Sequence, residues 1–388
     1  MGYDENLAFI FFCPTRIVFG SGVAREVKVE VQALGCSRAL VVTDSLLASR
    51  TDIPNRVVKA LGSACVGVFS EVEPDSGVHI VDAGAAFGRE LGADCIVSVG
   101  GGSAIDTAKG IAILLKEGGQ LRDYQGFQVL ERPQTPHIAI PTTAGTGSEV
   151  TYVAVVKDHE AKQKLLFGDN HIIPNTALLD PDLTLGLPPG LTAATGMDAL
   201  SHAVEAMHSL QREPIADGLA LHAIRLIREF LPRAVEDGRD LTARGQMLIA
   251  ATVAGAAFSN AQVGLVHAMA HTVGARFGVH HGLANSILMP HVLRFNAPDT
   301  AAWYRPVGEA LGLAVGGMSD EEVAEATAQA IYDFAGRLGL SRRLAEQGVP
   351  EDALPDLAEG TLLDAAIVYN GRPVTGAEEI HEIFKAAY

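Results

Sequence analysis

Hydrophobic and polar positions follow two different patterns along this chain, and the change falls near residue 187. Before that point, short apolar runs rich in β-branched residues alternate with segments of helical periodicity. The apolar runs that we predict to be strands are 9–12, 39–43, 64–70, 95–99 and 137–140, and the helices predicted between them are 46–61, 78–91 and a segment that begins near Ser103. Continuous apolar strands alternating with helices predict a parallel α/β sheet.

After the Pro-Pro-Gly sequence at 188–190, strand-like runs largely disappear and helical segments continue to the end. The stretch 251–274 contains no charged residue, but Ser259 and other polar residues interrupt it. We therefore predict buried helices there and no membrane span. The pattern predicts an α/β domain over 1–186 and an all-α domain over 187–388, with a site between the two.

Composition excludes some partners. The chain has 388 residues, enough for two domains, and its net charge is −17. No basic block is present that would neutralise phosphates, which argues against nucleic acid and against an anionic membrane as partners. A nucleotide held at a helix N-terminus remains possible under this charge.

The start of the chain and its cysteines indicate a cytoplasmic protein. A signal peptide would need a basic leading segment, yet the start carries Asp4 and Glu5. The four cysteines form no CxxC pair. We expect them to be reduced, mostly buried thiols.

Two glycine-rich turns each follow a predicted strand. The first reads GGGSAIDTAK at 100–109 and leads into a helix, and the second reads PTTAGTGSE at 141–149. Glycines let a backbone approach a phosphate, and the N–H groups at a helix start favour an anion. A plain tight turn would explain the first loop alone, which is not the GxGxxG fingerprint. Two such loops at strand ends together favour a dinucleotide site.

Two side chains bear on the type of dinucleotide. Asp44 follows the predicted strand 39–43, where a carboxylate can bind a ribose diol and would repel a 2′-phosphate, which favours NAD over NADP. A helix N-cap would explain Asp44 equally well. Lys164 is long enough to reach the ribose or the phosphates, although a lone lysine is commonly a solvated surface residue.

One carboxylate, together with three imidazoles out of four histidines, is a candidate set of ligands for a metal site. Asp198 and His202 are four residues apart in a helical segment and share one face of it. His267 and His271 have the same spacing in an uncharged segment, and His281 follows a break. Such groups suit Fe²⁺ or Zn²⁺ equally. The alternatives are core histidines and a surface Asp198–His202 ion pair, which would contribute only about 0.5 kcal/mol.

Five segments together resemble the iron-containing (group III) alcohol dehydrogenase family, in the same order and over nearly the whole chain. They are GGGSAIDTAK, PTTAGTGSE, GMDALSHAVEA, GLVHAMAHTVGA and HHGLANSILMPH. The resemblance implies an N-terminal Rossmann-like NAD-binding domain and a helical metal-binding domain, the architecture shared with dehydroquinate synthase. The metal ligands that it implies are Asp198, His202, His267 and His281, the last chosen over His280 because it precedes Gly282.

The resemblance also implies the cofactor contacts. The residues expected to line or contact NAD(H) are Gly101, Gly102, Ser103, Thr142, Thr143, Thr146, Thr151 and Lys164, and Asp44 falls where NAD-preferring members carry an acidic residue. His271 is expected near the nicotinamide, either as a relay for the alcohol proton or as a residue that lines the pocket.

We therefore expect an oxidoreductase that transfers a hydride between a metal-bound primary alcohol or diol and NAD⁺, and that reduces the aldehyde in reverse. One alternative is a metal-independent reductase of the maleylacetate type, although such enzymes typically have Asn where Asp198 stands. Another is a dehydroquinate synthase-type lyase. The expected partners are a small alcohol or aldehyde and a second copy of the chain, in a homodimer or a larger homo-oligomer, paired through the apolar segment Ala8–Phe12.

Overall fold

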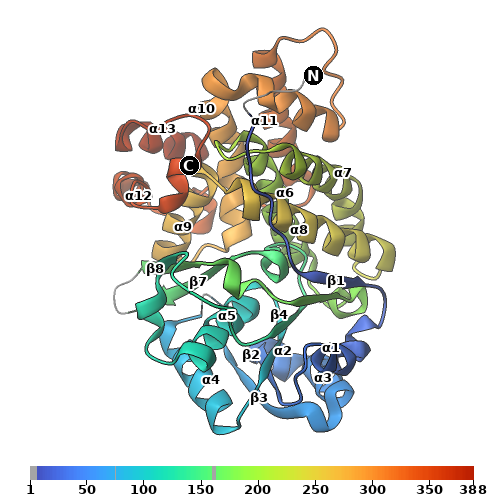
Figure 1. The fold of residues 1–388 in the computed structure, drawn as a ribbon. Coiled ribbons are helices and arrows are strands. Elements are labelled where there is room, and N and C mark those ends of the chain that lie inside the picture. Colours follow the sequence, from blue (N-terminus) through green and yellow to red (C-terminus); the bar gives the residue numbers. More distant parts are fainter. Residues whose placement is uncertain (1–6, 75, 160–162) are drawn as a thin grey trace.

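A computed structural model describes residues 7–74, 76–159 and 163–388. An α/β part and a helical part lie one above the other in Figure 1. The α/β part is built on a six-stranded sheet with the order β1-β9-β6-β4-β2-β3 and with every pair parallel. Its strands are β1 (Arg16–Phe19), β2 (Ala39–Asp44), β3 (Cys65–Val72), β4 (Cys95–Gly100), β6 (His137–Pro141) and β9 (Thr176–Leu179). Four of the five predicted strands are thereby confirmed.

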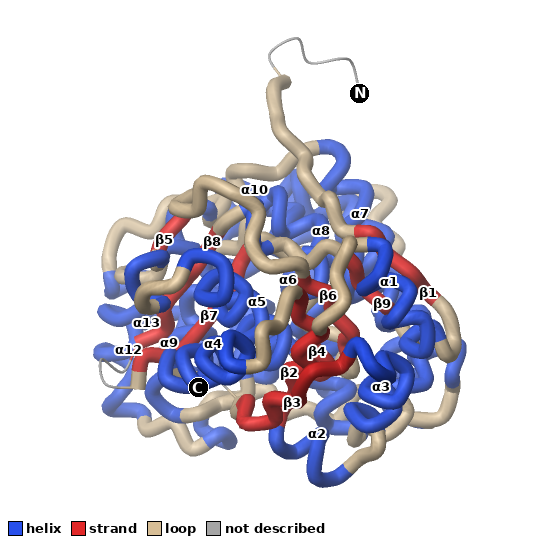
Figure 2. Tube along the Cα trace, turned by 60° about the horizontal axis from the view of Figure 1, so that its bottom comes forward, coloured by secondary structure: helices blue, strands red, loops and turns tan. Residues whose placement is uncertain are grey.

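Helices cover both faces of this sheet (Figure 2). They are α1 (Val27–Ala33), α3 (Ile53–Leu61), α4 (Val78–Glu90) and α5 (Gly102–Glu117). Alternate side chains of β2 enter two different cores: Leu40 and Val42 pack with residues of α4 and α5, whereas Val41 packs with residues of α1 and α3. A strand buried on both faces has no polar face, which explains its continuous apolar run.

The predicted helix 46–61 is two helices. The chain forms α2 (Ser45–Arg50), becomes extended at Thr51, and starts α3 at Ile53. Pro54 lies in the first turn of α3. A proline inside one continuous helix would lose a backbone hydrogen bond and clash with the carbonyl one turn back, so a new helix begins there.

The strand predicted at 9–12 is wrong. Residues 7–15 have no regular secondary structure, and β1 begins only at Arg16. The backbone of Phe12 is instead bound by the side chain of Asn260: the Phe12 N–H donates to Oδ1 at 2.7 Å and Nδ2 donates to the Phe12 carbonyl at 3.3 Å. The neighbour of this segment is a helix, which offers a side chain and no backbone edge for strand pairing.

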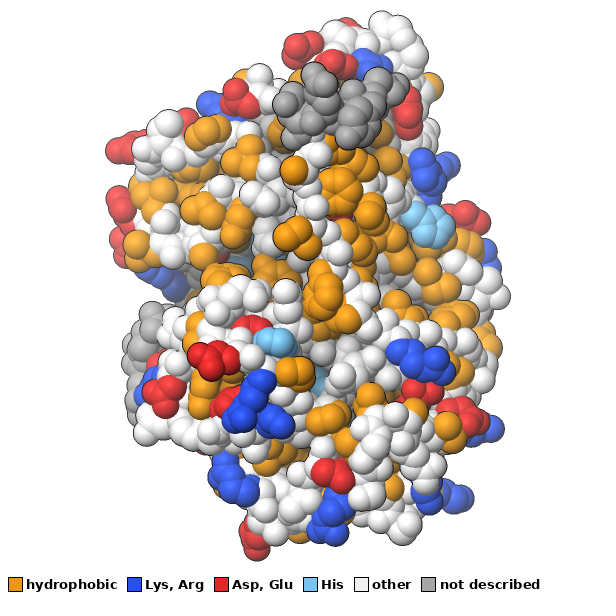
Figure 3. Space-filling model, in the orientation of Figure 1, with side chains coloured by type: hydrophobic (Ala, Val, Ile, Leu, Met, Phe, Trp, Pro, Cys, Tyr) orange, Lys and Arg blue, Asp and Glu red, His pale blue; other side chains and the backbone are white. Residues whose placement is uncertain are grey.

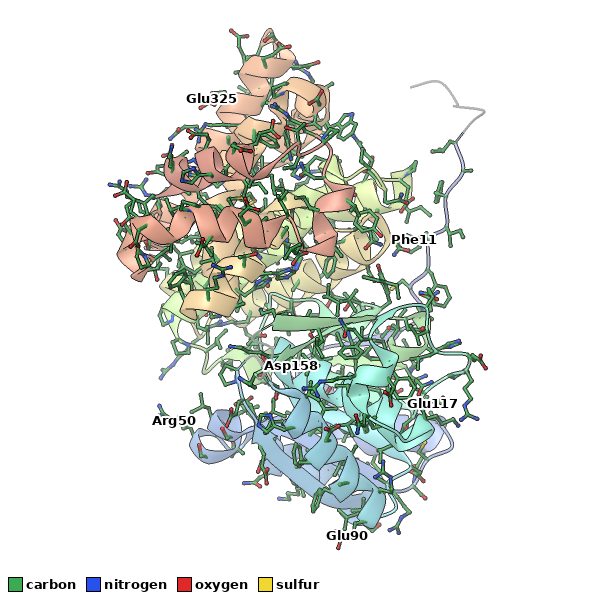
Figure 4. All side chains as sticks on the ribbon, turned by 90° about the vertical axis from the view of Figure 1, so that its left-hand side faces the viewer. Phe11, Arg50, Glu90, Glu117, Asp158 and Glu325 are labelled. Carbon is green, nitrogen blue, oxygen red and sulfur yellow. The ribbon has the colours of Figure 1, made fainter. Side chains whose placement is uncertain are left out.

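A small second sheet was not predicted. It contains β5 (Gly126–Phe127), β7 (Val153–Asp158) and β8 (Gln163–Gly168), with β7 and β8 antiparallel. The polar ends of the hairpin, where Lys157 pairs with Lys164, obscure its alternating pattern in the sequence. Asp158, at the end of β7, is labelled near the middle of Figure 4.

The helical part packs around one central helix. Its helices are α6 (Pro189–His208), α7 (Pro214–Glu236), α8 (Leu241–Ala261), α9 (Leu265–Phe277), α10 (His281–Ala310), α11 (Asp320–Arg337), α12 (Leu354–Thr361) and α13 (Ala377–Ala387). All residues of α6 from Thr192 to His208 are buried. The change from strands to helices near Pro188 is therefore confirmed.

One described helix, α8, is long and apolar enough to cross a membrane by length and composition alone. However, 67% of its most apolar window is buried inside the protein, against α6 and α7. This is the expected property of a core helix, as predicted for 251–274. All four cysteines are free thiols, but only Cys95 is buried and the others are half-buried, so the expectation of mostly buried thiols is wrong.

Candidate active site

The predicted metal ligands come from three helices that meet at a cavity lined by both parts of the chain. Asp198 and His202 lie on α6, His267 lies on α9, and His281 is the first residue of α10. A Cβ on Gly282 would lie 2.3 Å from the carbonyl oxygen of Ala194, so only glycine lets the start of α10 approach α6 this closely. That approach places Nε2 of His281 3.6 Å from Oδ1 of Asp198.

Three of the four candidates present their ligand atoms to one point. One atom each of Asp198, His267 and His281 lies within 4.8 Å of the others. His202 is outside this group but adjacent, because its ring stacks on that of His267 with 4.6 Å between centroids. The neighbouring His280 is exposed, which agrees with the choice of His281.

The residues present fit a divalent cation. Nδ2 of Asn285 lies 2.8 Å from Oδ1 of Asp198 and 3.2 Å from Nε2 of both His267 and His281. An amide nitrogen carries only two hydrogens but here faces three acceptor atoms. At least one acceptor lone pair in this group therefore has no hydrogen from Asn285, which suits a bound cation. One carboxylate and three imidazoles form a donor set that iron and zinc both accept.

Burial keeps two of the imidazoles neutral. It lowers the pKa of His202 to about 4. Burial, together with the nearby His267, also holds the pKa of His281 well below its usual range. His267 differs: burial lowers its pKa, but the nearby carboxylates, Glu205 foremost, together outweigh burial and raise the pKa. Neutral imidazoles with free lone pairs are the form that binds a metal.

Two carboxylates that orient these histidines were missed in the sequence. The fully buried Glu205 accepts a hydrogen bond from Nδ1 of His267. Asp364 accepts one from Nδ1 of His271 at 2.8 Å. The signal for Glu205 was its position three residues after His202, on the same face of α6. Asp364 lies 93 residues from His271, and no sequence pattern connects them.

The same cavity, about 220 Å³ in volume, is lined by residues from both parts of the chain. The predicted residues on its wall are Gly102, Ser103, Thr146, Thr151, Lys164, Asp198, His202, His267, His271 and His281. Gly101, Thr142, Thr143 and Asp44 are not on this wall. The Thr142 N–H donates to the Gly100 carbonyl at 3.0 Å, which holds the two glycine-rich loops together.

Asp44 is the N-cap of α2. Its Oδ1 accepts a hydrogen bond from the Leu47 N–H at 2.7 Å, which is the alternative that its sequence context left open. Its second oxygen lies beside the first glycine loop, 3.2 Å from where a Cβ on Gly100 would be. Capping occupies only one of the two oxygens, so the second is still able to accept from a ligand.

The second glycine loop packs closely against the helical part. Gly147 has a left-handed φ of +63°, and a Cβ on it would lie 2.6 Å from the Cα of Gly255 on α8. A Cβ on Gly102 would lie 2.7 Å from the Thr146 side chain. The second loop therefore contacts α8 through backbone, and it contacts the first loop through the Thr146 side chain.

Lys109 holds the second glycine-rich loop in place through hydrogen bonds. This residue was not identified as a site residue in the sequence analysis. Its fully buried ammonium donates to the hydroxyls of Ser148 (2.9 Å) and Thr151 (3.1 Å) and to the carbonyl of Val153 (2.6 Å). Burial lowers the pKa of Lys109 to about 8, although the nearby Asp106 opposes this. Thr151 lines the cavity while its hydroxyl is held by this lysine.

A parallel sheet with two glycine-rich loops, facing a helical part that supplies a carboxylate and imidazoles, defines a class of nucleotide-dependent oxidoreductases. The family model described as iron-containing alcohol dehydrogenase matches residues 14–181. The model described as the C-terminal part of the Fe-containing alcohol dehydrogenase family matches residues 192–388. The chain belongs to the iron-containing alcohol dehydrogenase family, which confirms the resemblance and the fold class.

Relatives match over their full length. The chain is 40% identical over 379 residues to an NAD-dependent methanol dehydrogenase of Bacillus methanolicus, covering 97% of this chain and 99% of the relative. It is 39% identical over 384 residues to a 1,3-propanediol dehydrogenase of Klebsiella pneumoniae, covering 98% and 99%. A solved structure of a 1,3-propanediol oxidoreductase superposes with a TM-score of 0.95 at 38% identity, covering 98% and 100%. Family membership makes this chain an oxidoreductase of the alcohol dehydrogenase type, with a nicotinamide cofactor and a divalent metal.

Proposed function

We propose that this enzyme oxidises a primary alcohol or diol with NAD⁺ and reduces the corresponding aldehyde with NADH. The observation that supports this most is that a carboxylate and three imidazoles line the same cavity as residues of both glycine-rich loops. Hydride transfer needs the alcohol carbon and the nicotinamide ring held in contact, and a shared cavity of this kind allows it.

Asp198, His202, His267 and His281 are the proposed ligands, and Fe²⁺ is the proposed ion because of the family; Zn²⁺ suits the same donor types. A cation bound there supplies Lewis-acid polarisation of the alcohol oxygen, and NAD⁺ supplies the hydride acceptor. The chain contributes the orientation of each ligand. Glu205 holds the Nδ1–H of His267, which leaves Nε2 of that ring as the ligand atom.

The cofactor is proposed to lie along the two glycine-rich loops. Gly101, Gly102 and Ser103 bring backbone N–H groups at the start of α5 towards a phosphate, and Thr142, Thr143, Thr146 and Thr151 follow on the second loop. Lys164 contacts the cofactor from β8. The uncapped oxygen of Asp44 accepts from a ribose hydroxyl, and its charge favours NAD over NADP.

His271 is the proposed proton relay. Its Nδ1 bonds to Asp364 at 2.8 Å, so its Nε2 is available to the cavity that it lines. Its ring stacks on that of His281, with 5.3 Å between centroids and 12° between planes. A relay beside a metal ligand can move the alcohol proton towards solvent.

The decisive test measures NADH formation by absorbance with purified protein that has been stripped of metal and then given Fe²⁺ under anaerobic conditions. A panel of short primary alcohols and diols is offered with NAD⁺. We expect multiple turnovers that depend on metal. We expect Asp198→Ala and His267→Ala to lose both bound metal and activity, whereas His222→Ala, on the exposed face of α7, keeps both.

Other outcomes would contradict the proposal. Full activity without metal would indicate a reductase of the maleylacetate type. Reaction without net NADH would indicate a dehydroquinate synthase-type lyase. Full activity of Asp198→Ala with no metal bound would overturn the ligand assignment.

A homodimer is proposed through the N-terminal segment. Leu7, Phe9, Ile10 and Phe12 are exposed, Ile10 by 86%, and β1 continues the strip with Ile17 and Phe19. Figure 3 shows hydrophobic side chains along the path of this segment, and Figure 4 shows it beside the helical part, with Phe11 labelled. We expect Ile10→Asp to reduce the mass measured by light scattering, whereas Ile215→Asp on α7 leaves it unchanged. An unchanged mass in both variants would contradict this interface, and a larger homo-oligomer would be seen directly.

The division into a domain over 1–186 and a domain over 187–388 is likewise proposed, with the active site between them. We also propose a cytoplasmic location, because four free thiols suit a reducing compartment. Fractionation of cells that produce the native chain would check the location.

A further inference from the structure

Tyr152 and Gln262 form a polar pair in the cavity wall. The Tyr152 hydroxyl donates a hydrogen bond to Oε1 of Gln262 at 2.7 Å, and both residues line the cavity that contains the proposed metal ligands and His271. Most other wall residues that belong neither to the proposed metal site nor to the cofactor loops are apolar. They include Phe127, Val155, Leu166, Phe258, Val263 and Ala366. The pair is thus a polar spot in a mainly apolar wall.

The backbone fixes Tyr152 tightly. Its N–H donates to the Ser259 hydroxyl on α8 at 3.2 Å, and its carbonyl accepts from the Asp169 N–H at 2.8 Å. The preceding residue, Thr151, is held by Lys109 beneath the second glycine loop. Tyr152 therefore cannot shift without disturbing both the helical part and the cofactor loop.

Gln262 is held in an unfavourable conformation. Its φ is +69° and its ψ is 166°, a combination that is found almost exclusively in glycine. Its N–H closes the last turn of α8 by donating to the Phe258 carbonyl at 2.7 Å. The Phe258 ring in turn stacks on the proposed ligand His202, with 4.2 Å between centroids. Such a conformation costs free energy and persists where its surroundings impose it, commonly at functional sites.

The pair retains both a donor and an acceptor for a ligand. Within the described part of the chain, this bond is the side-chain hydrogen bond that each of the two groups makes. It leaves the amide N–H groups of Gln262 and a lone pair on the Tyr152 oxygen. Exchanging the amide oxygen and nitrogen would still leave one donor and one acceptor. Burial raises the pKa of Tyr152 to about 12, so the phenol keeps its proton at any working pH.

We propose that Tyr152 and Gln262 are specificity-determining residues that bind a second hydroxyl group of the substrate while its first is at the proposed metal site. A hydroxyl matches this pair because it accepts from the Gln262 amide and donates to the Tyr152 oxygen. An alkyl group at the same place would leave both groups unpaired in an apolar wall, which costs binding free energy. The inference rests on the proposed function and narrows it to short alcohols that carry a second hydroxyl.

The test compares substrates of equal size. Each diol is paired with the alcohol in which a methyl group replaces the second hydroxyl: ethylene glycol with 1-propanol, 1,3-propanediol with 1-butanol, and 1,4-butanediol with 1-pentanol. The metal-loaded wild-type enzyme is assayed with NAD⁺ for kcat/KM. We expect at least one diol to exceed its partner by roughly tenfold, about the net effect of one hydrogen bond. A preference for the monohydric alcohol in all three pairs would overturn the inference.

Variants then test whether Tyr152 and Gln262 cause the preference for diols. Tyr152→Phe and Gln262→Met keep size and remove polar groups, and we expect each to abolish or reverse the diol preference, mainly through the KM of the diol. Gln262→Asn keeps the amide at the same backbone position but is shorter, and it should lose the preference as well. Tyr332→Phe, on α11 and outside the cavity, is the matched control and should keep the wild-type ratio.

The ratio of kcat/KM for a diol to kcat/KM for its paired alcohol is measured within each variant, so a general loss of activity does not affect it. A ratio retained in Tyr152→Phe and in both Gln262 variants would overturn the assignment even if wild type prefers diols. Oxidation of 1-butanol without any diol preference would reject this inference alone. Failure to oxidise any alcohol with metal and NAD⁺ would reject the proposed function itself.

Discussion

The fully buried carboxylate of Glu205 accepts a hydrogen bond from Nδ1 of His267, and Nε2 of the same ring faces Asn285 beside Asp198 and His281. One oxygen of Glu205 also accepts the N–H groups of Gly264 (3.1 Å) and Val266 (2.8 Å). These groups form the start of α9. Glu205 therefore sets both the position of the helix and the tautomer of its histidine.

We expect Glu205→Gln to weaken metal binding by about 10- to 100-fold, the usual effect of losing a partner behind a ligating histidine. The glutamine is still able to accept one hydrogen bond, but it lacks the charge that keeps the proton on Nδ1. Bound metal would be measured by mass spectrometry after dialysis against a graded chelator. Glu236→Gln, at the exposed end of α7, is the control. Equal metal retention in the two variants would contradict the role of Glu205.

Local patterns were sufficient to predict much of this fold. The strand 95–99, the glycine turn and the helix after it are close in sequence, and each has its own periodicity. His267 and His271 were placed on one helix because a four-residue spacing needs no tertiary information. The N-terminal segment failed for the opposite reason. An apolar run forms a strand only beside a free backbone edge, and Phe12 lies beside the side chain of Asn260.

The partners of the candidate site residues were beyond sequence reasoning. Asp364 reaches His271 across 93 residues, and Asn285 meets Asp198 across 87. Such pairs depend on how distant segments pack together, and the periodicity of a sequence does not predict this packing. Sequence reasoning could have identified Glu205, because it follows His202 by three residues on a helix that was already predicted.

Lys109→Met is expected to change how stability depends on pH. The pKa of Lys109 is about 8 in the folded protein and ordinarily 10.5. Between these values the unfolded chain binds a proton that the folded one does not, so this lysine makes the free energy of unfolding rise with pH. Relative to Lys109→Met, the wild type should therefore gain stability from pH 7.5 to pH 9.5. Urea unfolding at both pH values would measure the difference.

Lys116→Met is the control for this effect, because Lys116 is exposed on the same helix and should give a curve parallel to that of wild type. Lys109→Met should also raise the KM for NAD⁺, since Ser148 and Thr151 lose their shared donor. A Lys109→Met curve parallel to wild type would show that the buried ammonium does not titrate in this range.

Asp364→Asn is expected to lower kcat by about 10- to 100-fold with little change in bound metal. A positioned proton-transfer group contributes about 100- to 10,000-fold, and this variant misorients His271 without removing it. The asparagine amide can donate to His271 and favour the tautomer with the proton on Nε2. That tautomer presents an N–H group to the cavity instead of the lone pair that would accept the alcohol proton. Metal content and kcat would be measured on the same sample. Asp356→Asn, on the exposed face of α12, is the control. Loss of metal in parallel with kcat would assign Asp364 a structural role instead.

Gly147→Ala is expected to damage both stability and cofactor binding, because the new Cβ would lie 2.6 Å from the Cα of Gly255. Gly348→Ala separates this clash from backbone strain: Gly348 also has a left-handed φ, of +76°, but a Cβ there would meet nothing within 4 Å. Left-handed strain alone costs about 1 kcal/mol, roughly a 1 °C loss in Tm for a chain of this size. We expect a clearly larger loss for Gly147→Ala, together with a raised KM for NAD⁺, as the loop must move from α8. Equal losses of Tm in the two variants would show that the loop does not depend on this contact.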